Sequence, residues 1–149
     1  MGEPAVRDQL EKYIMLKTEV ERYIERDARR RSEEQFPASR SGDGSQHRSG
    51  TGDQLERRII SRLDDDEVMK PHIEACLGEM EEIRKMIYGL GNALHRDILR
   101  CRYMEGYDYK LLTWPEVALM IFRNNDEKYV KAVQRAHKKA LKAIEKSRQ

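Results

Sequence analysis

Apolar residues recur with a helical period over most of the chain, most clearly near its C-terminal end. At about 100° per residue, the stretch from 128 to 146 places apolar side chains on one arc and cations on the opposite one. The apolar arc consists of Val130, Val133, His137, Ala140, Leu141 and Ile144. The cationic arc consists of Lys128, Lys131, Arg135, Lys138, Lys139, Lys142 and Lys146. The pattern predicts a helix that packs on one face and presents a cationic stripe on the other.

A shorter helix is predicted just before this one. Thr113 precedes Glu116 by three residues, which is the spacing of a capping box, and Pro115 fits a first helical turn that needs no amide donors. A helix should therefore begin at Trp114. Asn124, Asn125 and Asp126 are short polar residues that suit a turn and the cap of the next helix.

The N-terminal part of the chain predicts an amphipathic helix over residues 1–34. Its narrow apolar seam must be covered by another helix, because an isolated helix in water is only marginally stable. The seam consists of Val6, Leu10, Tyr13, Val20 and Ile24. Three arginines, 29–31, close the helix, and we interpret them as favourable partners of the helix dipole rather than as a nucleic-acid contact.

Residues 35–53 contain four glycines and four serines, which predicts a flexible loop, and the lone His47 within it is not expected to bind a metal. Residues 54–91 predict a second stem helix, interrupted by the acidic run 64–67 and restarted with Pro71 in its first turn. Its seam has an a/d spacing and consists of Ile73, Cys76, Met80, Ile83 and Ile87. The two seams favour an antiparallel helical hairpin, although pairing between two chains would use the same residues.

A break at 89–92 separates this stem from the last predicted domain, residues 92–149. Asn92 is the expected cap of a scaffold helix that ends at Gly106. The apolar residues of that helix are Leu94, Ile98, Leu99 and Tyr103, and Arg100 and Arg102 are expected at the surface or on phosphates. The fold class is therefore all-α: a long antiparallel helical hairpin, or coiled-coil-like stem, followed by a C-terminal helix-turn-helix.

The charge distribution sharpens this picture. Residues 92–149 carry 13 Lys and Arg against 7 Asp and Glu, whereas residues 54–91 carry 6 against 9. A basic end joined to an acidic stem indicates a polyanionic partner for the C-terminal end only. The chain has no apolar run long enough to cross a bilayer and no signal-peptide pattern, so we expect a cytoplasmic protein without a membrane partner.

The sequence offers no catalytic pattern. It lacks a nucleophile elbow, a glycine-rich phosphate loop, an H-E-x-x-H and a C-x-x-C, and its four histidines are scattered. Cys76 and Cys101 are interpreted as small buried hydrophobes. We therefore expect a protein that is not an enzyme and that needs neither a cofactor nor a metal.

A helix with an apolar back and a cationic front suits the major groove of DNA. The residues expected at double-stranded DNA are Thr113, Lys128, Lys131, Ala132, Gln134, Arg135, Lys138, Lys139 and Lys142. Among them Arg135 suits a bidentate contact with guanine, and Gln134 is a weaker candidate for adenine. The competing interpretation is an ordinary solvated lysine face.

Three blocks of sequence resemble sigma-region-4-like phage transcriptional regulators, the ArpU and RinA type of late-transcription activators. The blocks are 98–106 (ILRCRYMEG), 112–118 (LTWPEVA) and 133–141 (VQRAHKKAL). The chain departs from that family where residues 107–110 lengthen the link before Leu112, and in a longer segment between Ala118 and Val133. The resemblance implies a DNA-binding regulator of phage or prophage late genes that acts at promoters with host RNA polymerase.

Two rival functions stay open on the sequence alone. One is a DNA-packaging protein similar to a terminase small subunit, in which a helix-turn-helix and a stem serve assembly. The other is a helical adaptor that does not bind DNA. The stem could also join copies of the chain into a homo-oligomer.

Overall fold

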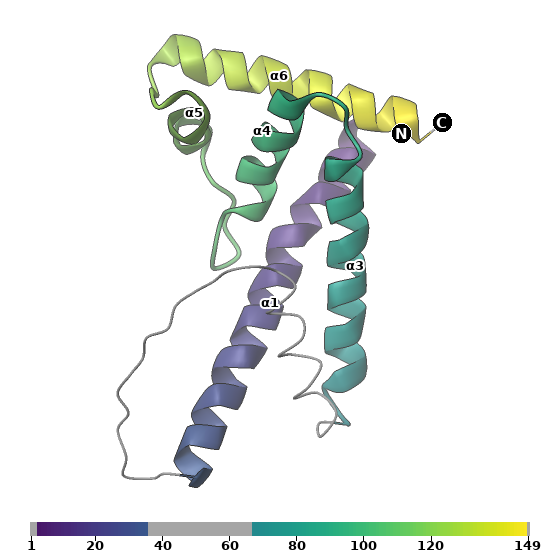
Figure 1. Ribbon diagram of the computed structural model, residues 1–149, viewed down its shortest axis with the longest axis vertical. Helices are drawn as coiled ribbons and strands as arrows, with labels where there is room; N and C mark the ends of the chain where they lie inside the picture. The colour runs from purple at the N-terminus through teal and green to yellow at the C-terminus, as the bar shows by residue number, and fades with distance from the viewer. Residues whose placement is uncertain (1–2, 36–66, 149) are drawn as a thin grey trace. The chain divides into compact units, whose positions relative to one another are not determined.

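The computed structural model describes residues 3–35 and 67–148, and the chain is all-α over these residues. The helices are α1 Glu3–Gln35, α3 Lys70–Tyr88, α4 Ala93–Met104, α5 Trp114–Phe122 and α6 Glu127–Ser147 (Figure 1). The predicted loop 35–53 lies almost entirely outside the described residues. So do His47, the first part of the predicted second stem helix and most of its acidic run.

The chain divides into two compact units. One consists of residues 1–18 and 78–149, and the other of residues 19–77. In the second unit, α1 buries Val20 and Tyr23, and α3 buries Ile73 and Cys76. The first unit contains the basic end of the chain.

The apolar seams predicted for α1 and α3 are buried with one partial exception. Val6, Leu10, Tyr13 and Val20 of α1 are buried, as are all five predicted seam residues of α3, whereas Ile24 is only half-buried. In the first unit, the Arg84 guanidinium of α3 donates a hydrogen bond of 3.2 Å to the Tyr13 hydroxyl of α1. Pro71 lies in the first turn of α3, as predicted from its missing amide proton.

The predicted break after α3 is confirmed. Residues 89–92 are not helical, and the Asn92 side chain accepts a hydrogen bond from the His95 amide to cap α4. Ile98, Leu99 and Tyr103 are buried on α4, but Leu94 is 40% exposed and does not belong to the core. Leu94 lies in the first turn of α4, one turn before Ile98, and the neighbouring described elements do not cover it.

A tight turn joins α4 to the segment before α5. Tyr107 and Lys110 exchange backbone hydrogen bonds, while Asp108 and Tyr109 between them have positive φ angles of 54° and 67°. A side-chain carbon at Gly106 would come within 2.0 Å of the Lys110 carbonyl oxygen, so only glycine fits there. The four residues that lengthen this link are therefore an ordered turn that reverses the chain.

Candidate nucleic-acid interface

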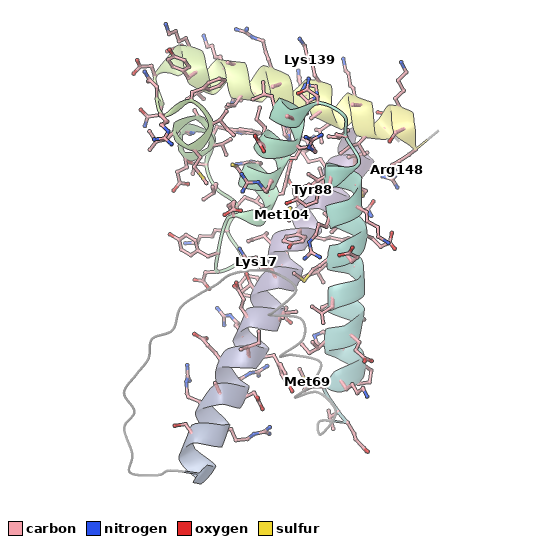
Figure 2. The ribbon with its side chains drawn as sticks, viewed as in Figure 1. Lys17, Met69, Tyr88, Met104, Lys139 and Arg148 are labelled. Atoms are coloured by element: carbon pink, nitrogen blue, oxygen red, sulfur yellow. The ribbon has the colours of Figure 1, made fainter. Side chains whose placement is uncertain are left out.

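The α6 helix separates its two faces as the sequence pattern predicts. Val133, His137, Ala140, Leu141 and Ile144 are buried, and Val130 is half-buried. The predicted site residues of α6 lie outside this face. Lys128, Lys131, Gln134, Arg135, Lys138, Lys139 and Lys142 are exposed, and Ala132 is half-buried. Figure 2 labels Lys139 on this helix.

A shared apolar cluster holds α6 against α4 and α5. Its buried members come from all three helices and from the segment before α5: Ile98, Cys101, Leu112, Val117, Ala118 and Val133. Trp114, Ile121 and Tyr129 pack against the cluster from its edges. Because the cluster is continuous, it fixes the orientation of the exposed cations of α6 relative to α5. Cys101 is a buried thiol whose pKa is raised by burial, and Cys76 is likewise buried.

His137 is the polar member of the buried face of α6. Its Nε2 shares a hydrogen bond of 2.6 Å with the Tyr103 hydroxyl of α4, and its ring meets the Trp114 ring edge-to-face with the centroids 4.7 Å apart. Burial, with smaller contributions from the charges of Arg102 and Arg7, lowers the pKa of His137 to about 4. Burial also raises the pKa of Tyr103 to about 12. Both groups are therefore neutral near pH 7, and the pair fastens α6 to α4.

Arg102 is half-buried, and its side chain turns toward Trp114 and Leu112 rather than standing free at the surface as predicted. Its guanidinium lies 4.1 Å from the centre of the Trp114 ring and donates a hydrogen bond to the Leu112 carbonyl. Its Nε is buried and has no hydrogen-bond partner among residues 3–35 and 67–148. Arg100 instead stays at the surface, in an ion pair of 2.8 Å with Glu105. Both arginines are half-buried, but only Arg100 places its guanidinium in an ion pair at the surface, as the sequence interpretation assumed.

Thr113 acts as the cap of α5. Its hydroxyl accepts a hydrogen bond from the Glu116 amide, and the Glu116 carboxylate accepts one from the Thr113 amide, so both halves of the predicted capping box are present. The cap fixes the helix start at Trp114, as predicted. Thr113 is exposed, but its hydroxyl is already engaged within the box.

Four residues, Arg123 to Asp126, join α5 to α6. Arg123 ends α5 in the left-handed conformation, with φ of 59° and its amide bonded to the Leu119 carbonyl. Asp126 occupies the predicted N-cap position, but its side chain makes no capping bond. The Asn124 side chain instead accepts from the Asp126 amide, so the polar residues of this turn order the link itself.

The exposed cations of α6 differ in what already engages them. Lys131 forms an ion pair of 3.0 Å with Glu127, and the Lys128 ammonium lies 5.1 Å from the centre of the Tyr129 ring. Within the described ranges, no ion pair or ring contact involves the later cations of the stripe. These are Arg135, Lys138, Lys139, Lys142 and Lys146. A ligand anion would meet them without first displacing a protein carboxylate.

Sequence reasoning missed a group of contacts on α1 that secures the turn before α5. The Lys17 ammonium donates to the carbonyl oxygens of Met104 and Gly106 at 2.8 and 2.9 Å (Figure 2). The Thr18 hydroxyl accepts from the Tyr109 amide at 2.9 Å. The local sequence carries no signal for these bonds, because they join residues about ninety positions apart through backbone groups.

None of the described helices is long and apolar enough to cross a membrane. Over residues 3–35 and 67–148, no three histidine, cysteine or acidic side chains gather into a possible metal site. Comparison of the chain with protein-family models, with curated proteins and with solved structures finds no match.

Proposed function

We propose that the chain binds double-stranded DNA through a helix-turn-helix formed by α5 and α6, with α4 behind them. In this proposal it is a sequence-specific transcription regulator of phage or prophage late genes, which acts with host RNA polymerase in the bacterial cytoplasm. DNA binding is argued from the geometry of α6. The regulatory role comes only from the resemblance of the three sequence blocks to sigma-region-4-like regulators.

The separation of charge on α6 is the observation that carries DNA binding. One face is buried against α4 and α5, and the opposite face exposes lysines and an arginine over its whole length. Such a helix can keep its apolar side on its own domain while its cations meet phosphates and base edges in the major groove. The four-residue link also agrees with the three to four residues that typically join the helices of this motif.

Different parts of α6 would then take different roles. The first turns of a recognition helix usually reach base edges, whereas later residues contact phosphates. Lys128, Lys131 and Ala132 lie in those first turns, followed by Arg135, which we propose as the guanine reader. Lys138, Lys139 and Lys142 would contact the phosphate backbone. Thr113 is a weaker contact than the sequence suggested, because its hydroxyl already serves the cap.

The long helices complete the proposal as a stem. In this proposal the buried seams of α1 and α3 pair as an antiparallel hairpin within one chain, in which each seam would supply the apolar cover that the other needs. The same stem would carry any homo-oligomer that forms through these helices. A pull-down with the intact chain that recovers RNA polymerase rather than a terminase would favour transcription over packaging.

A matched pair of charge-reversal variants tests DNA binding. The first changes Arg135, Lys138 and Lys142 of α6 to Glu, and the second changes Lys12, Arg26 and Arg29 of α1 to Glu; all six are exposed. Binding to a mixed-sequence duplex is measured by fluorescence anisotropy at several salt concentrations. The α6 variant should lose binding, because each phosphate contact contributes about 0.9 to the slope of log affinity against log salt.

The α1 variant is the control, since it removes the same number of cations from a helix outside the proposed interface. It should retain most of the affinity, and circular dichroism should show that both variants remain helical. An α6 variant that binds as tightly as the unmodified protein would refute the DNA interface. Equal losses of DNA affinity in both variants would show that binding is nonspecific attraction by the net charge of the chain.

A further inference from the structure

One carboxylate stands among the cations of α6. The helix contains two acidic residues, of which Glu145 lies near its end and is half-buried, whereas Glu127 lies in its first turn. The Glu127 side chain is 80% exposed and forms an ion pair of 3.0 Å with Lys131, whose side chain is 59% exposed. Among the cations of the stripe, Lys131 alone forms an ion pair within the described ranges. A cation proposed for the DNA contact is therefore already held by a carboxylate of its own helix.

Glu127 lies on the side of α6 that the proposed DNA contact uses. Four residues stand at positions i, i+4, i+7 and i+11, which lie along one side of a helix. They are Glu127, Lys131, Gln134 and Lys138, and all four are exposed. In a complex of α6 with DNA, the Glu127 carboxylate would therefore approach the duplex together with these neighbours.

Helix stability alone does not account for this pair. An exposed ion pair contributes little to stability, because water screens it. A carboxylate in the first turn also interacts favourably with the helix dipole, but that interaction does not require Lys131. Against DNA the same carboxylate has a stronger effect, because it is repelled by each phosphate that it approaches. The pair therefore bears on how α6 binds DNA more than on how it folds.

We propose that Glu127 is a specificity-determining residue, which withholds Lys131 from nonspecific DNA and releases it at a selected site. The inference rests on the proposed DNA-binding function and concerns how the same surface discriminates between duplexes. On a random duplex the Glu127 carboxylate stays paired with Lys131, so the Lys131 ammonium gains no phosphate contact. A group that penalises the wrong partner contributes to specificity as much as one that attracts the right partner.

The selected site would differ by offering the carboxylate a donor. In the major groove, the donors on base edges are the amino groups of cytosine and adenine, and a carboxylate suits the amino group of cytosine. Where the site presents such a group, the Glu127 carboxylate accepts a hydrogen bond from it. The Lys131 ammonium then becomes available for a phosphate oxygen.

Binding of the full chain to two duplexes, measured by fluorescence anisotropy, tests the inference. One duplex has a random sequence, and the other is the site that the unmodified chain selects from random duplexes. Glu127→Gln should lower the ratio of selected to random affinity by about fivefold or more, because it loses both the repulsion and the charged acceptor. The control is Glu145→Gln, which removes the same charge from the same helix and should leave this ratio unchanged.

Lys131→Met tests the ion pair itself, in two backgrounds. In the unmodified chain it should leave the salt slope for the random duplex unchanged, because Glu127 already holds the Lys131 ammonium. In the Glu127→Gln background it should reduce that slope by about 0.9, because the freed ammonium contacts one phosphate there.

The inference is overturned if Glu127→Gln changes the affinity ratio no more than Glu145→Gln does. It is also overturned if Lys131→Met reduces the salt slope equally in both backgrounds. In either case the unmodified chain still binds and selects DNA, so the proposed function stands. An unmodified chain that binds no duplex, or that selects no site, overturns the proposed function and this inference with it.

Discussion

The helices α1 and α6 are both long and rich in charge, but they distribute that charge differently. Over its 33 residues α1 carries eight Lys and Arg against nine Asp and Glu, a net charge of −1. Over its 21 residues α6 carries seven Lys and Arg against two Glu, a net charge of +5. The two helices therefore hold almost the same number of cations, but in sequence α1 balances them with acidic residues and α6 does not.

Two cations of α1 bind groups of the protein itself. Arg30 pairs with the buried Asp27 at 3.0 Å, and Lys17 donates to two backbone carbonyls. On α6, by contrast, Arg135 and Lys142 are exposed, and no ion pair of theirs is found in the described part of the chain. A positive potential outside the molecule requires cations that are not neutralised nearby. The arrangement of charge, more than the number of charges, therefore distinguishes a candidate DNA surface from a solvated helix.

The largest expected effect is on the free energy of unfolding, and it comes from the protonation of His137 on the buried face of α6. Its pKa is about 4 in the folded protein and 6.5 as its ordinary value, so the unfolded chain binds the proton more tightly. The stability contributed by neutral His137 is therefore complete above pH 6.5 and is lost as the pH falls toward 4. This difference corresponds to about 3 kcal/mol in the free energy of unfolding.

His137→Phe isolates that contribution. It removes the titrating ring, so the free energy of unfolding, measured with urea between pH 5 and pH 7, should fall less steeply with decreasing pH than in the unmodified chain. At pH 7 the variant should be less stable by about 1–3 kcal/mol, since the Tyr103 hydroxyl loses its buried partner. Parallel pH profiles for the two proteins would show that His137 does not control this dependence.

Most of the helical framework followed from the sequence because its signals are local. The capping box at Thr113, the break after Tyr88 and the cap at Asn92 each depend on residues within one helical turn. The amphipathic period of α6 likewise located its buried face, including His137. The pattern does not determine which partner a buried polar residue contacts. It does not predict, for example, that His137 bonds to the Tyr103 hydroxyl.

The contacts that hold the turn before α5 could not be predicted from the sequence, for a physical reason. Lys17 bonds to carbonyl oxygens, and every residue has one, so no residue type near Met104 or Gly106 marks the site. Arg102 was misplaced because a guanidinium over an aromatic ring looks the same in sequence as one in solvent. The exposure of Leu94 was missed because helical period alone does not say how far the neighbouring elements extend.

An intermediate effect is expected on DNA recognition, when one arginine is removed from α6 and one from α1. Arg135→Ala should lower the affinity for a selected DNA site by about 1–3 kcal/mol and relax the preference at one base pair, if its guanidinium reads guanine. Arg29→Ala removes an exposed arginine from α1 and should leave both affinity and preference unchanged. Selection from random duplexes with each variant measures the preference directly. An unaltered base preference for Arg135→Ala would show that another residue of α6 occupies the reading position.

The smallest expected effects are those of single lysine substitutions, which distinguish a lysine that stabilises the fold from one that binds DNA. Lys17→Met keeps an unbranched side chain of similar length but removes the ammonium. That ammonium donates to the carbonyl oxygens of Met104 and Gly106 at 2.8 and 2.9 Å. We expect a loss of about 1–2 kcal/mol in the free energy of unfolding, because these bonds are only partly buried. Lys142→Met is the matched change on α6, where the side chain is exposed. It should alter stability by less than about 0.5 kcal/mol.

DNA affinity should reverse this order. Lys142→Met should weaken binding to all duplexes about equally and reduce the salt slope by about 0.9, because one phosphate contact is lost. Lys17→Met should leave the salt slope unchanged under conditions in which the variant remains folded, since the Lys17 ammonium is directed to carbonyls of the protein. Thermal denaturation and anisotropy titrations on the same two preparations give all four values. If Lys17→Met lowered the salt slope and Lys142→Met lowered stability, the assignment of structural cations to α1 and binding cations to α6 would be wrong.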